Sequence, residues 1–216
     1  MKLGILGGTF DPPHLGHLAL AATGMEQLGL QRVLWVLTGQ SPFKQTQALS
    51  PSQLRLSMVA AAIADYPAFA LSRVDLDRPA PQYSADTVML LSKQFPHDEM
   101  TYVMGTDSLL TFPEWDRPQE ILGRCNLGVF RRPGFEVDPD IMEERLPGIS
   151  ERIYWINGEE QAISGWDVRC RVRAGLPIAE LVPEKVADII LTHGLYTGKN
   201  SPKQAMITGF PAPSKR

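Results

Sequence analysis

Two histidines three residues apart are the side chains whose type and spacing best fit a chemical task. They belong to the stretch Gly7-Gly8-Thr9-Phe10-Asp11-Pro12-Pro13-His14-Leu15-Gly16-His17. Residues three apart share one face of a helix, so both imidazoles are expected to project from the same first turn. The free N–H groups and the dipole of a helix N-terminus attract anions. Adjacent glycines allow a ligand close to the backbone, and together these features predict a phosphate-binding site.

The flanking sequence predicts the elements that hold this loop. An apolar run precedes it, an alanine- and leucine-rich run follows it, and Gly29 is well placed to end the helix that this second run predicts. The expected strands are 2–6, 33–37, 69–74, 101–104, 126–130 and 152–156. The expected helices are 14–28, one with Ser50 as N-cap, one with Ser84 as N-cap, 164–173 and 183–193, while 135–150 shows no assignable pattern.

This alternation of strands and helices is typical of an α/β protein. We expect a Rossmann-like open, mostly parallel sheet with helices on both faces and a small C-terminal helical part. The chain has 216 residues, and we expect a single domain over 1–197, helical from about residue 164. The tail over 198–216 lacks periodicity and is expected to be mobile.

Composition and charge limit the partners and the location. The net charge of −3 disfavours a nucleic-acid partner, which would usually require a basic surplus. The sequence shows no basic region with an apolar run typical of a signal peptide, and no apolar run long enough for a membrane span. Cys125 and Cys170 are far apart, which predicts neither a zinc site nor a disulfide framework. A cytoplasmic location without membrane attachment is therefore expected.

Two common nucleotide-binding patterns are absent. The glycines near the start fall at positions 4, 7 and 8, which does not match GxGxxG, and the second strand ends in Leu37-Thr38-Gly39 without an acidic residue. GxxxxGK[ST] is also missing. In an open α/β sheet, ligands lie outside the carboxyl ends of the strands. The loops at those ends carry His14, His17, Lys44, Tyr83, Asp107 and Arg131.

The stretch from Gly7 to His17 resembles the signature of the HxGH nucleotidylyltransferases. Over about residues 2–197 the chain resembles, within that superfamily, the bacterial nicotinate-nucleotide adenylyltransferases. The segments that carry the narrower resemblance are Ser41-Pro42-Phe43-Lys44, Gln82-Tyr83-Ser84-Ala85-Asp86-Thr87, Gly105-Thr106-Asp107-Ser108 with Trp115, and Arg131-Arg132-Pro133-Gly134. Phe43 stands where the family has a histidine.

A later segment departs further from the family pattern. It reads Ile163-Ser164-Gly165-Trp166-Asp167-Val168-Arg169, in which Ser164 and Arg169 match the family. Gly165 and Trp166 replace a serine and a threonine whose hydroxyls contact ATP phosphates in the family. Gly165 still offers its backbone N–H.

The resemblance implies adenylyl transfer from ATP to nicotinate mononucleotide, giving nicotinate adenine dinucleotide and pyrophosphate in NAD biosynthesis. The attacking group would be a phosphate monoester, largely a dianion at pH 7 because its second pKa is about 6, so no general base is needed. Catalysis would consist of aligning two anions and stabilising the charge that develops. The resemblance also implies Mg²⁺, held mainly through ATP phosphates and water and without a metal site built by the protein.

The resemblance assigns the site residues as follows. The catalytic residues would be His14, His17, Lys44 and Arg169. ATP would be bound by Gly7, Gly8, Thr9, Phe10, His14, His17, Gly105, Asp107, Ile163, Ser164 and Arg169. Nicotinate mononucleotide would be bound by Thr38, Lys44, Tyr83, Ser84, Thr87, Thr106 and Trp115. The N–H groups of the helix at Ser84 suit its carboxylate, and Trp115 offers a flat face for the pyridine ring.

Two alternatives stay open. One is adenylyl transfer to another phosphate acceptor, such as nicotinamide mononucleotide or phosphopantetheine, which the segment from Tyr83 to Thr87 and Trp115 disfavour. The other is a nucleotide-binding regulator without activity. The altered residues Gly165 and Trp166 favour it, whereas the retained His14, His17, Lys44 and Arg169 disfavour it. Assembly into a homo-oligomer is also left open.

Overall fold

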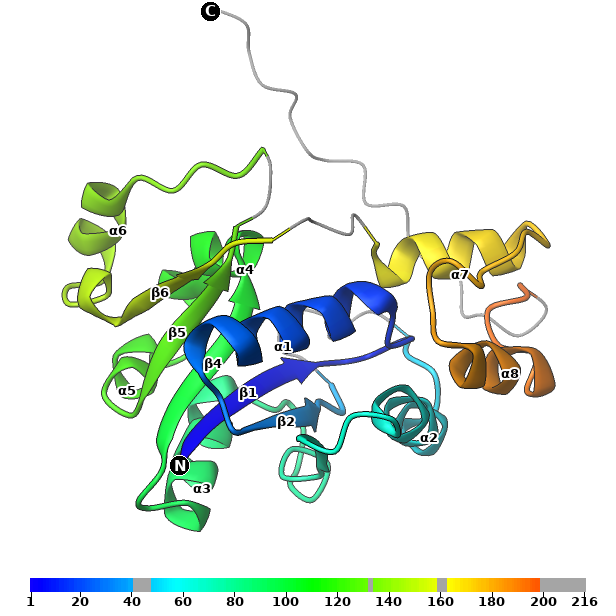
Figure 1. Ribbon diagram of the computed structural model, residues 1–216, viewed down its shortest axis with the longest axis horizontal. Helices are drawn as coiled ribbons and strands as arrows, with labels where there is room; N and C mark the ends of the chain where they lie inside the picture. The colour runs from blue at the N-terminus through cyan, green and yellow to red at the C-terminus, as the bar shows by residue number, and fades with distance from the viewer. Residues whose placement is uncertain (41–47, 132–133, 159–162, 199–216) are drawn as a thin grey trace, which may run out of the picture.

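A single six-stranded sheet with helices on both faces forms the centre of the molecule (Figure 1). The computed structural model describes residues 1–40, 48–131, 134–158 and 163–198. The strands are β1 (Lys2–Gly8), β2 (Arg32–Leu37), β3 (Phe69–Ser72), β4 (Glu99–Gly105), β5 (Cys125–Phe130) and β6 (Ile153–Ile156). The α-helices are α1 (Leu15–Leu28), α2 (Ser52–Ile63), α3 (Ser84–Gln94), α4 (Thr106–Thr111), α5 (Pro118–Leu122), α6 (Pro139–Arg145), α7 (Gly165–Arg173) and α8 (Glu184–Thr192). Short 3₁₀ turns are η2 (Phe112–Glu114) and η3 (Ser150–Arg152).

The strand order is β3-β2-β1-β4-β5-β6, and every neighbouring pair is parallel. The chain builds outward from β1 to β3, then returns to the other side of β1 for β4. The order therefore reverses between β1 and β4, which is where open α/β sheets leave a crevice for ligands. This arrangement confirms the predicted open, Rossmann-like sheet.

The side chains of the sheet alternate between two apolar layers. On one face, Leu6 and Trp35 pack with residues of α1, α2, α7 and α8. On the other face, Leu34 and Val36 pack with residues of α3 to α6. The alternation follows from the period of two along a strand, and both faces are covered, as expected for a parallel sheet.

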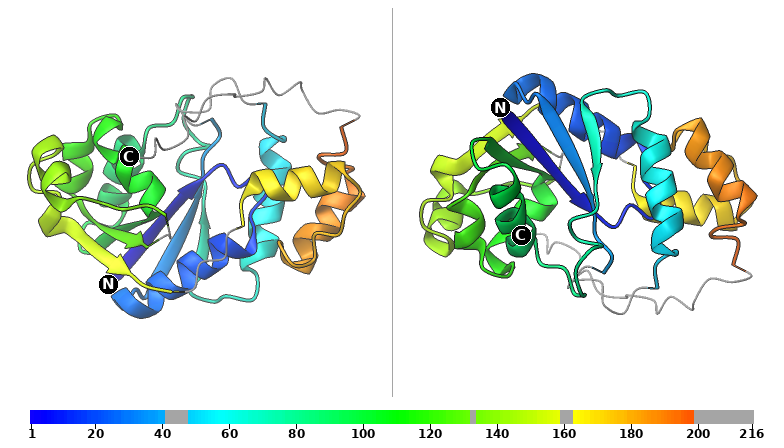
Figure 2. Two further views of the ribbon diagram at one scale, coloured as in Figure 1. Left: turned by 90° about the horizontal axis from the view of Figure 1, so that it is seen from above. Right: turned by 90° about the horizontal axis from the view of Figure 1, so that it is seen from below.

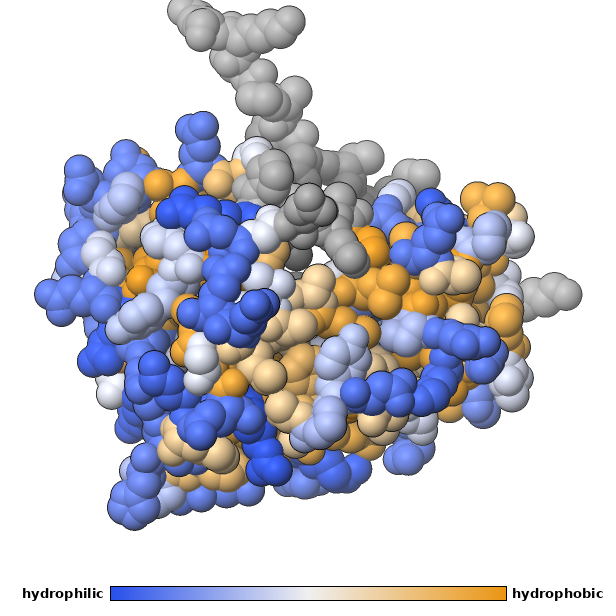
Figure 3. Space-filling view, viewed as in Figure 1, coloured by the Kyte–Doolittle hydropathy of each residue, from blue (hydrophilic) through white to orange (hydrophobic). Residues whose placement is uncertain are grey.

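The C-terminal helices gather at one end of the molecule. Figure 2 shows α7 and α8 beside α2, away from α4 to α6, and apolar residues of α8 (Val186 and Ile190) join the core that α2 supplies. Figure 3 shows polar side chains over much of the α6 side of the visible face and apolar residues gathered near α1 and α7. Among the described residues, no helix combines the length and the apolar character needed to cross a bilayer.

The first predicted elements are confirmed closely. His14 is the N-cap of α1, and Gly29 ends the helix with a φ of 63°, a conformation that glycine adopts without strain. The last two helices and all six strands lie within two residues of their predicted bounds. The tail prediction falls on 199–216, outside the described residues.

Two N-cap predictions are wrong, and one strand is shorter than predicted. Ser50 is not an N-cap: Pro51 occupies that position, and the amide of Ser50 instead donates to Asp11. Tyr83, with extended backbone, precedes α3, so Ser84 is its first helical residue. The strand at 69–74 ends at Ser72.

The unassigned stretch also holds a helix, α6. The side chain of Asp138 accepts hydrogen bonds from the amides of Asp140 and Ile141, and Pro139 is the first helical residue. An acidic N-cap followed by proline is a helix-start signal that was readable in the sequence.

Candidate active site

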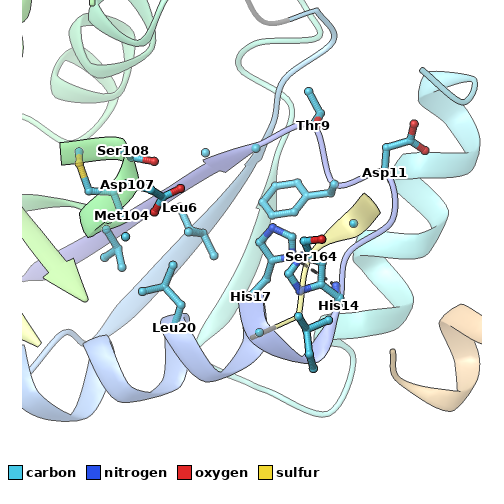
Figure 4. Close-up of a pocket in the computed structure, with 18 of the residues that line it drawn as sticks. Leu6, Thr9, Asp11, His14, His17, Leu20, Met104, Asp107, Ser108 and Ser164 are labelled. Atoms are coloured by element: carbon cyan, nitrogen blue, oxygen red, sulfur yellow. Dashed lines mark hydrogen bonds between the residues drawn. The ribbon is translucent and has the colours of Figure 1, made fainter. Parts of the chain in front are cut away.

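A cavity of about 430 Å³ lies at the carboxyl ends of β1 and β4, where the strand order reverses. Figure 4 shows Asp107 and Ser108 on one side of it and His14, His17 and Ser164 on the other. Eleven predicted residues line it: Gly7, Gly8, Thr9, Phe10, His14, His17, Gly105, Asp107, Ile163, Ser164 and Arg169. These are all of the residues predicted to bind ATP, and Trp115 of the acceptor set lines the cavity as well.

The two imidazole rings lie against each other at the start of α1. Their centroids are 3.7 Å apart, and His14 is 6% exposed. The backbone N–H of His14 donates to Nδ1 of His17 over 3.2 Å. An Nδ1 that accepts carries no proton, so the neutral ring of His17 holds its proton on Nε2. His17 is thereby oriented as a hydrogen-bond donor.

An aromatic chain beneath the loop fixes the ring of His17. Phe10 meets it edge-on at 5.0 Å between centroids and lies 5.1 Å from Trp35, which is fully buried in the sheet. Phe10 has a φ of 44°, a region that residues with side chains rarely adopt. A Cβ on Gly8 would come within 3.1 Å of the Phe10 ring. The missing Cβ at Gly8 therefore leaves room for the Phe10 ring that supports His17, as well as for a ligand.

Asp11 joins this loop to two later parts of the chain. Its carboxylate accepts from the Tyr196 hydroxyl at 2.6 Å and from the Ser50 amide at 3.1 Å. Its carbonyl accepts from Nη1 of Arg169 at 2.6 Å. Burial, followed by the negative charge of Asp11, raises the pKa of Tyr196, so its hydroxyl stays a donor. Arg169, predicted to hold ATP phosphates, is thus fixed at the edge of the cavity.

The N-terminus of α7 closes the same side of the cavity. Ser164, predicted as the first residue of this helix, is its N-cap and forms a reciprocal capping box with Asp167. A Cβ on Gly165 would lie 3.1 Å from Nη1 of Arg169 and 3.4 Å from the Asp11 carbonyl, so a larger residue would crowd that contact. Trp166 lines the cavity with 60% of its surface exposed.

Arg55 of α2, which the motifs do not single out, joins the loop after β1 to the loop between β2 and α2. It is 2% exposed and donates to the carbonyls of Thr9, Thr38, Gly39 and Ser50 over 2.7–2.9 Å. Burial lowers the pKa of Arg55, and the nearby Asp11 carboxylate opposes that shift. The loops after β1 and β2 are therefore held to each other by one buried cation.

Tyr102 of β4, also missed by the motifs, marks the border between the two predicted subsites. Its hydroxyl lies 3.3 Å from the Ser84 hydroxyl, and a Cβ on Gly7 would come within 2.4 Å of it. Its ring meets Trp115 edge-on at 5.8 Å between centroids. Burial raises the pKa of Tyr102 to about 12, so the phenol is neutral at ordinary pH.

Several predicted acceptor-site residues are engaged elsewhere. The hydroxyls of Thr38 and Thr87 both donate to the buried carboxylate of Asp75, at 3.0 and 2.6 Å. Thr106 is 1% exposed, and its hydroxyl donates to the Phe130 carbonyl. These three hydroxyls form hydrogen bonds within the protein. The Tyr83 carbonyl accepts a hydrogen bond from Arg78 at 2.9 Å. Lys44 lies outside the described residues.

The described residues hold no group of three or more His, Cys, Asp or Glu side chains suited to a metal ion. Asp11 and Asp107 are the carboxylates among the residues that line the cavity, and Asp11 is occupied by Tyr196 and Ser50. This donor set fits a hard cation carried mainly by a polyphosphate ligand and water.

The fold and the cavity define a class: an open, parallel α/β protein with a histidine pair facing a cavity at the switch point. The family model described as "Cytidylyltransferase-like" matches residues 5–171. Curated relatives narrow the family assignment further. A protein of Herpetosiphon aurantiacus is 38% identical over 90% of this chain and 98% of its own length. One of Saccharopolyspora erythraea is 37% identical over 99% of this chain and 97% of its own.

Both relatives carry the name "Probable nicotinate-nucleotide adenylyltransferase". This chain belongs to the nicotinate-nucleotide adenylyltransferase family of the cytidylyltransferase-like nucleotidyltransferases. Its fold is similar to that of a Plasmodium falciparum nicotinic acid mononucleotide adenylyltransferase complexed with NaAD. The TM-score is 0.73 at 16% identity, over 90% of this chain and 97% of that one.

Proposed function

We propose that this chain transfers the adenylyl group of ATP to nicotinate mononucleotide and releases pyrophosphate. The names of the relatives that match nine tenths or more of the chain support this assignment. The structural observation that carries it is the pair of imidazoles at the N-terminus of α1, 3.7 Å apart and facing a cavity at the switch point. A phosphate in that place meets the helix N–H groups and the Nε2–H of His17 together.

The reaction follows from this placement. A phosphate oxygen of the acceptor attacks the α-phosphorus of ATP, and the bond from that phosphorus to the bridging oxygen of the β-phosphate breaks. The electron pair leaves with pyrophosphate. His14 and His17 donate to the α- and β-phosphates, and Arg169 holds the β- or γ-phosphate from its anchor on the Asp11 carbonyl. No side chain needs to remove a proton, because the attacking oxygen is already charged.

The acceptor occupies the side of the cavity that Tyr102 borders. The first turn of α3 at Ser84 offers N–H groups to the nicotinate carboxylate, and Trp115 stacks on the pyridine ring. Lys44 remains a predicted contact of the acceptor phosphate. Mg²⁺ bound with ATP would neutralise phosphate charge, and Asp107, a carboxylate that lines the cavity, would accept hydrogen bonds from its water ligands.

The test is a pyrophosphate-release assay with ATP and Mg²⁺. The acceptors are nicotinate mononucleotide, nicotinamide mononucleotide and phosphopantetheine, each alone. Release with the first and little with the others supports the proposal. Preferred release with another acceptor reassigns the substrate. If no acceptor gives pyrophosphate release, the assignment of enzymatic activity is overturned and a nucleotide-binding regulator is the remaining hypothesis.

We also propose a cytoplasmic location for this activity. Both cysteines are free thiols in the structure, with Cys125 buried. A reducing compartment is compatible with that state. Labelling of cell fractions with an antibody to the chain tests the location.

A further inference from the structure

Arg117 lies in the segment that joins Trp115 to α5, in a conformation that its neighbours must hold. Its φ is 49° and its ψ is 54°, the left-handed region that a residue with a side chain occupies at a cost. Its guanidinium donates to Asp86 through Nη2 and to Asp116 through Nε, each at 2.6 Å. These two hydrogen bonds raise the pKa of Arg117, with Asp86 the larger cause.

Asp86 belongs to the first turn of α3, at the N-terminus proposed to receive the nicotinate carboxylate. A carboxylate in that turn competes with an anionic ligand for the same N–H groups and dipole. Two arginines hold it instead: Arg117 at 2.6 Å, and Arg78 at 3.4 Å from the other oxygen. Its charge is therefore compensated before any ligand arrives.

The contacts around this ion pair form a closed ring. Trp115 packs on Tyr102, and the Tyr102 hydroxyl reaches Ser84, the first residue of α3. Two residues further along α3, Asp86 binds Arg117, which stands two residues after Trp115. The ring joins the aromatic wall of the cavity to the start of α3.

A second arginine secures the other side of that helix start. Arg78 donates through Nη2 to the Tyr83 carbonyl, to Thr87 and to the buried Asp75, each at 2.9 Å. The start of α3 is thus held to the scaffold from within, so Arg117 acts on a fixed partner. What Arg117 sets is the position of the segment that carries Trp115.

We propose that Arg117 is a positioning residue for acceptor recognition: its ion pair with Asp86 holds Trp115 against the acceptor and neutralises Asp86. This inference rests on the proposed function for the identity of the acceptor. It assigns Arg117 no contact with ATP, whose predicted ligands lie on other segments. Loss of the pair therefore impairs the acceptor and leaves ATP unaffected.

The main variant is Arg117→Asn, since asparagine tolerates the left-handed region and lacks the charge. Arg117→Gly relieves the backbone strain and keeps the proposal testable if the asparagine variant folds poorly. Arg117→Lys retains the charge as the rescue variant. The matched control is Arg124→Asn. The side chain of Arg124 is 38% exposed against 40% for Arg117, and both arginines form an ion pair with Glu120.

For Arg117→Asn we expect the KM for nicotinate mononucleotide to rise about tenfold, with the KM for ATP within twofold of wild type. Arg117→Lys should recover most of the loss, and Arg124→Asn should resemble wild type. An unchanged acceptor KM, or an equal rise in both KM values, overturns the inference. If wild type prefers another acceptor, the proposed function fails and the same KM comparison is made with that acceptor.

A measurement without substrate separates the two proposals. In a Trp155→Phe, Trp166→Phe background, which removes the two other indoles that are not buried, acrylamide quenching reports on Trp115, because Trp35 is fully buried. Adding Arg117→Asn should raise the quenching constant about twofold. An unchanged constant overturns the positioning role even if the enzyme is active with nicotinate mononucleotide.

Discussion

Replacing Arg55 by methionine tests whether one buried cation holds the site loops together. The substitution keeps the aliphatic volume and removes the guanidinium. It leaves the carbonyls of Thr9, Thr38, Gly39 and Ser50 without their charged donor. It also removes one of the two positive charges that the described residues place near the buried Asp11, so that Arg169 alone remains.

The expected loss of folding free energy in Arg55→Met follows from two opposing effects. The four hydrogen bonds donated by the charged Arg55 contribute about 1.5–3 kcal/mol each, and their sum is an upper limit on the stability that the variant loses. The unfavourable burial of the cation, visible in the lowered pKa of Arg55, offsets part of it. Breaking buried ionic networks by removing one partner costs about 3–5 kcal/mol. At about 2–4 °C per kcal/mol for a chain of this size, Tm should fall by roughly 6–20 °C.

The assays are thermal and urea unfolding followed by circular dichroism, with Arg73→Met as the matched control. Arg73 makes one ion pair with Asp77, both side chains are more than half exposed, and we expect a loss of about 0–1 kcal/mol. Arg55→Lys, with a single charged head, should fall between the two. A loss below about 1 kcal/mol for Arg55→Met would refute the view that Arg55 organises these loops.

Three further predictions address catalysis, loop anchoring and pH. His17→Ala should lower kcat by about 10²–10³, the usual loss for one phosphate or oxyanion donor, with unchanged circular dichroism; near-normal turnover would contradict its role. Tyr196→Phe, which removes the 2.6 Å bond to Asp11, should raise the KM for ATP severalfold, whereas the exposed control Tyr154→Phe should not; equal KM values would rule out the anchoring role. Burial raises the pKa of Tyr102 and of Cys125 to about 12 each, so the unfolded chain releases these protons first and stability should fall between about pH 9 and 12, by up to ~1.4 kcal/mol per pH unit and group. Guanidinium unfolding at pH 8 to 11 measures this decline; it should begin later in Cys125→Ala, and a flat profile in wild type would contradict the assigned pKa values.

The part of the site that the sequence predicted is the part built by local rules. Glycines, prolines and histidines within eleven residues specify a strand, a loop and a helix start, and His14, His17 and Gly29 lie where those rules place them. The helix predicted over 164–173 is likewise found over Gly165–Arg173, with Ser164 as its N-cap. Such features depend on neighbours three or four residues away, which a single sequence displays directly.

The parts that were missed depend on distant partners. Asp11 and Tyr196 are 185 residues apart, and Arg55 reaches Thr9 across 46 residues. No periodicity links such pairs. The hydroxyl partners of Thr38 and Thr87, two predicted acceptor-site residues, could not be foreseen for the same reason. Both are claimed by Asp75, an acidic residue whose burial no local pattern reveals.

The orientation and the hydrogen bonds of Asp11 explain how a chain with net charge −3 can form the proposed anion site. Figure 4 shows its carboxylate directed away from the imidazole rings, toward α2. Tyr196 and the Ser50 amide satisfy that carboxylate on the outer side of the loop, while its carbonyl holds Arg169 on the inner side. One acidic residue thus fixes Arg169, which we propose holds the ATP phosphates, without presenting its own charge to them. The anion preference therefore comes from directed donors, and the overall charge has little part in it.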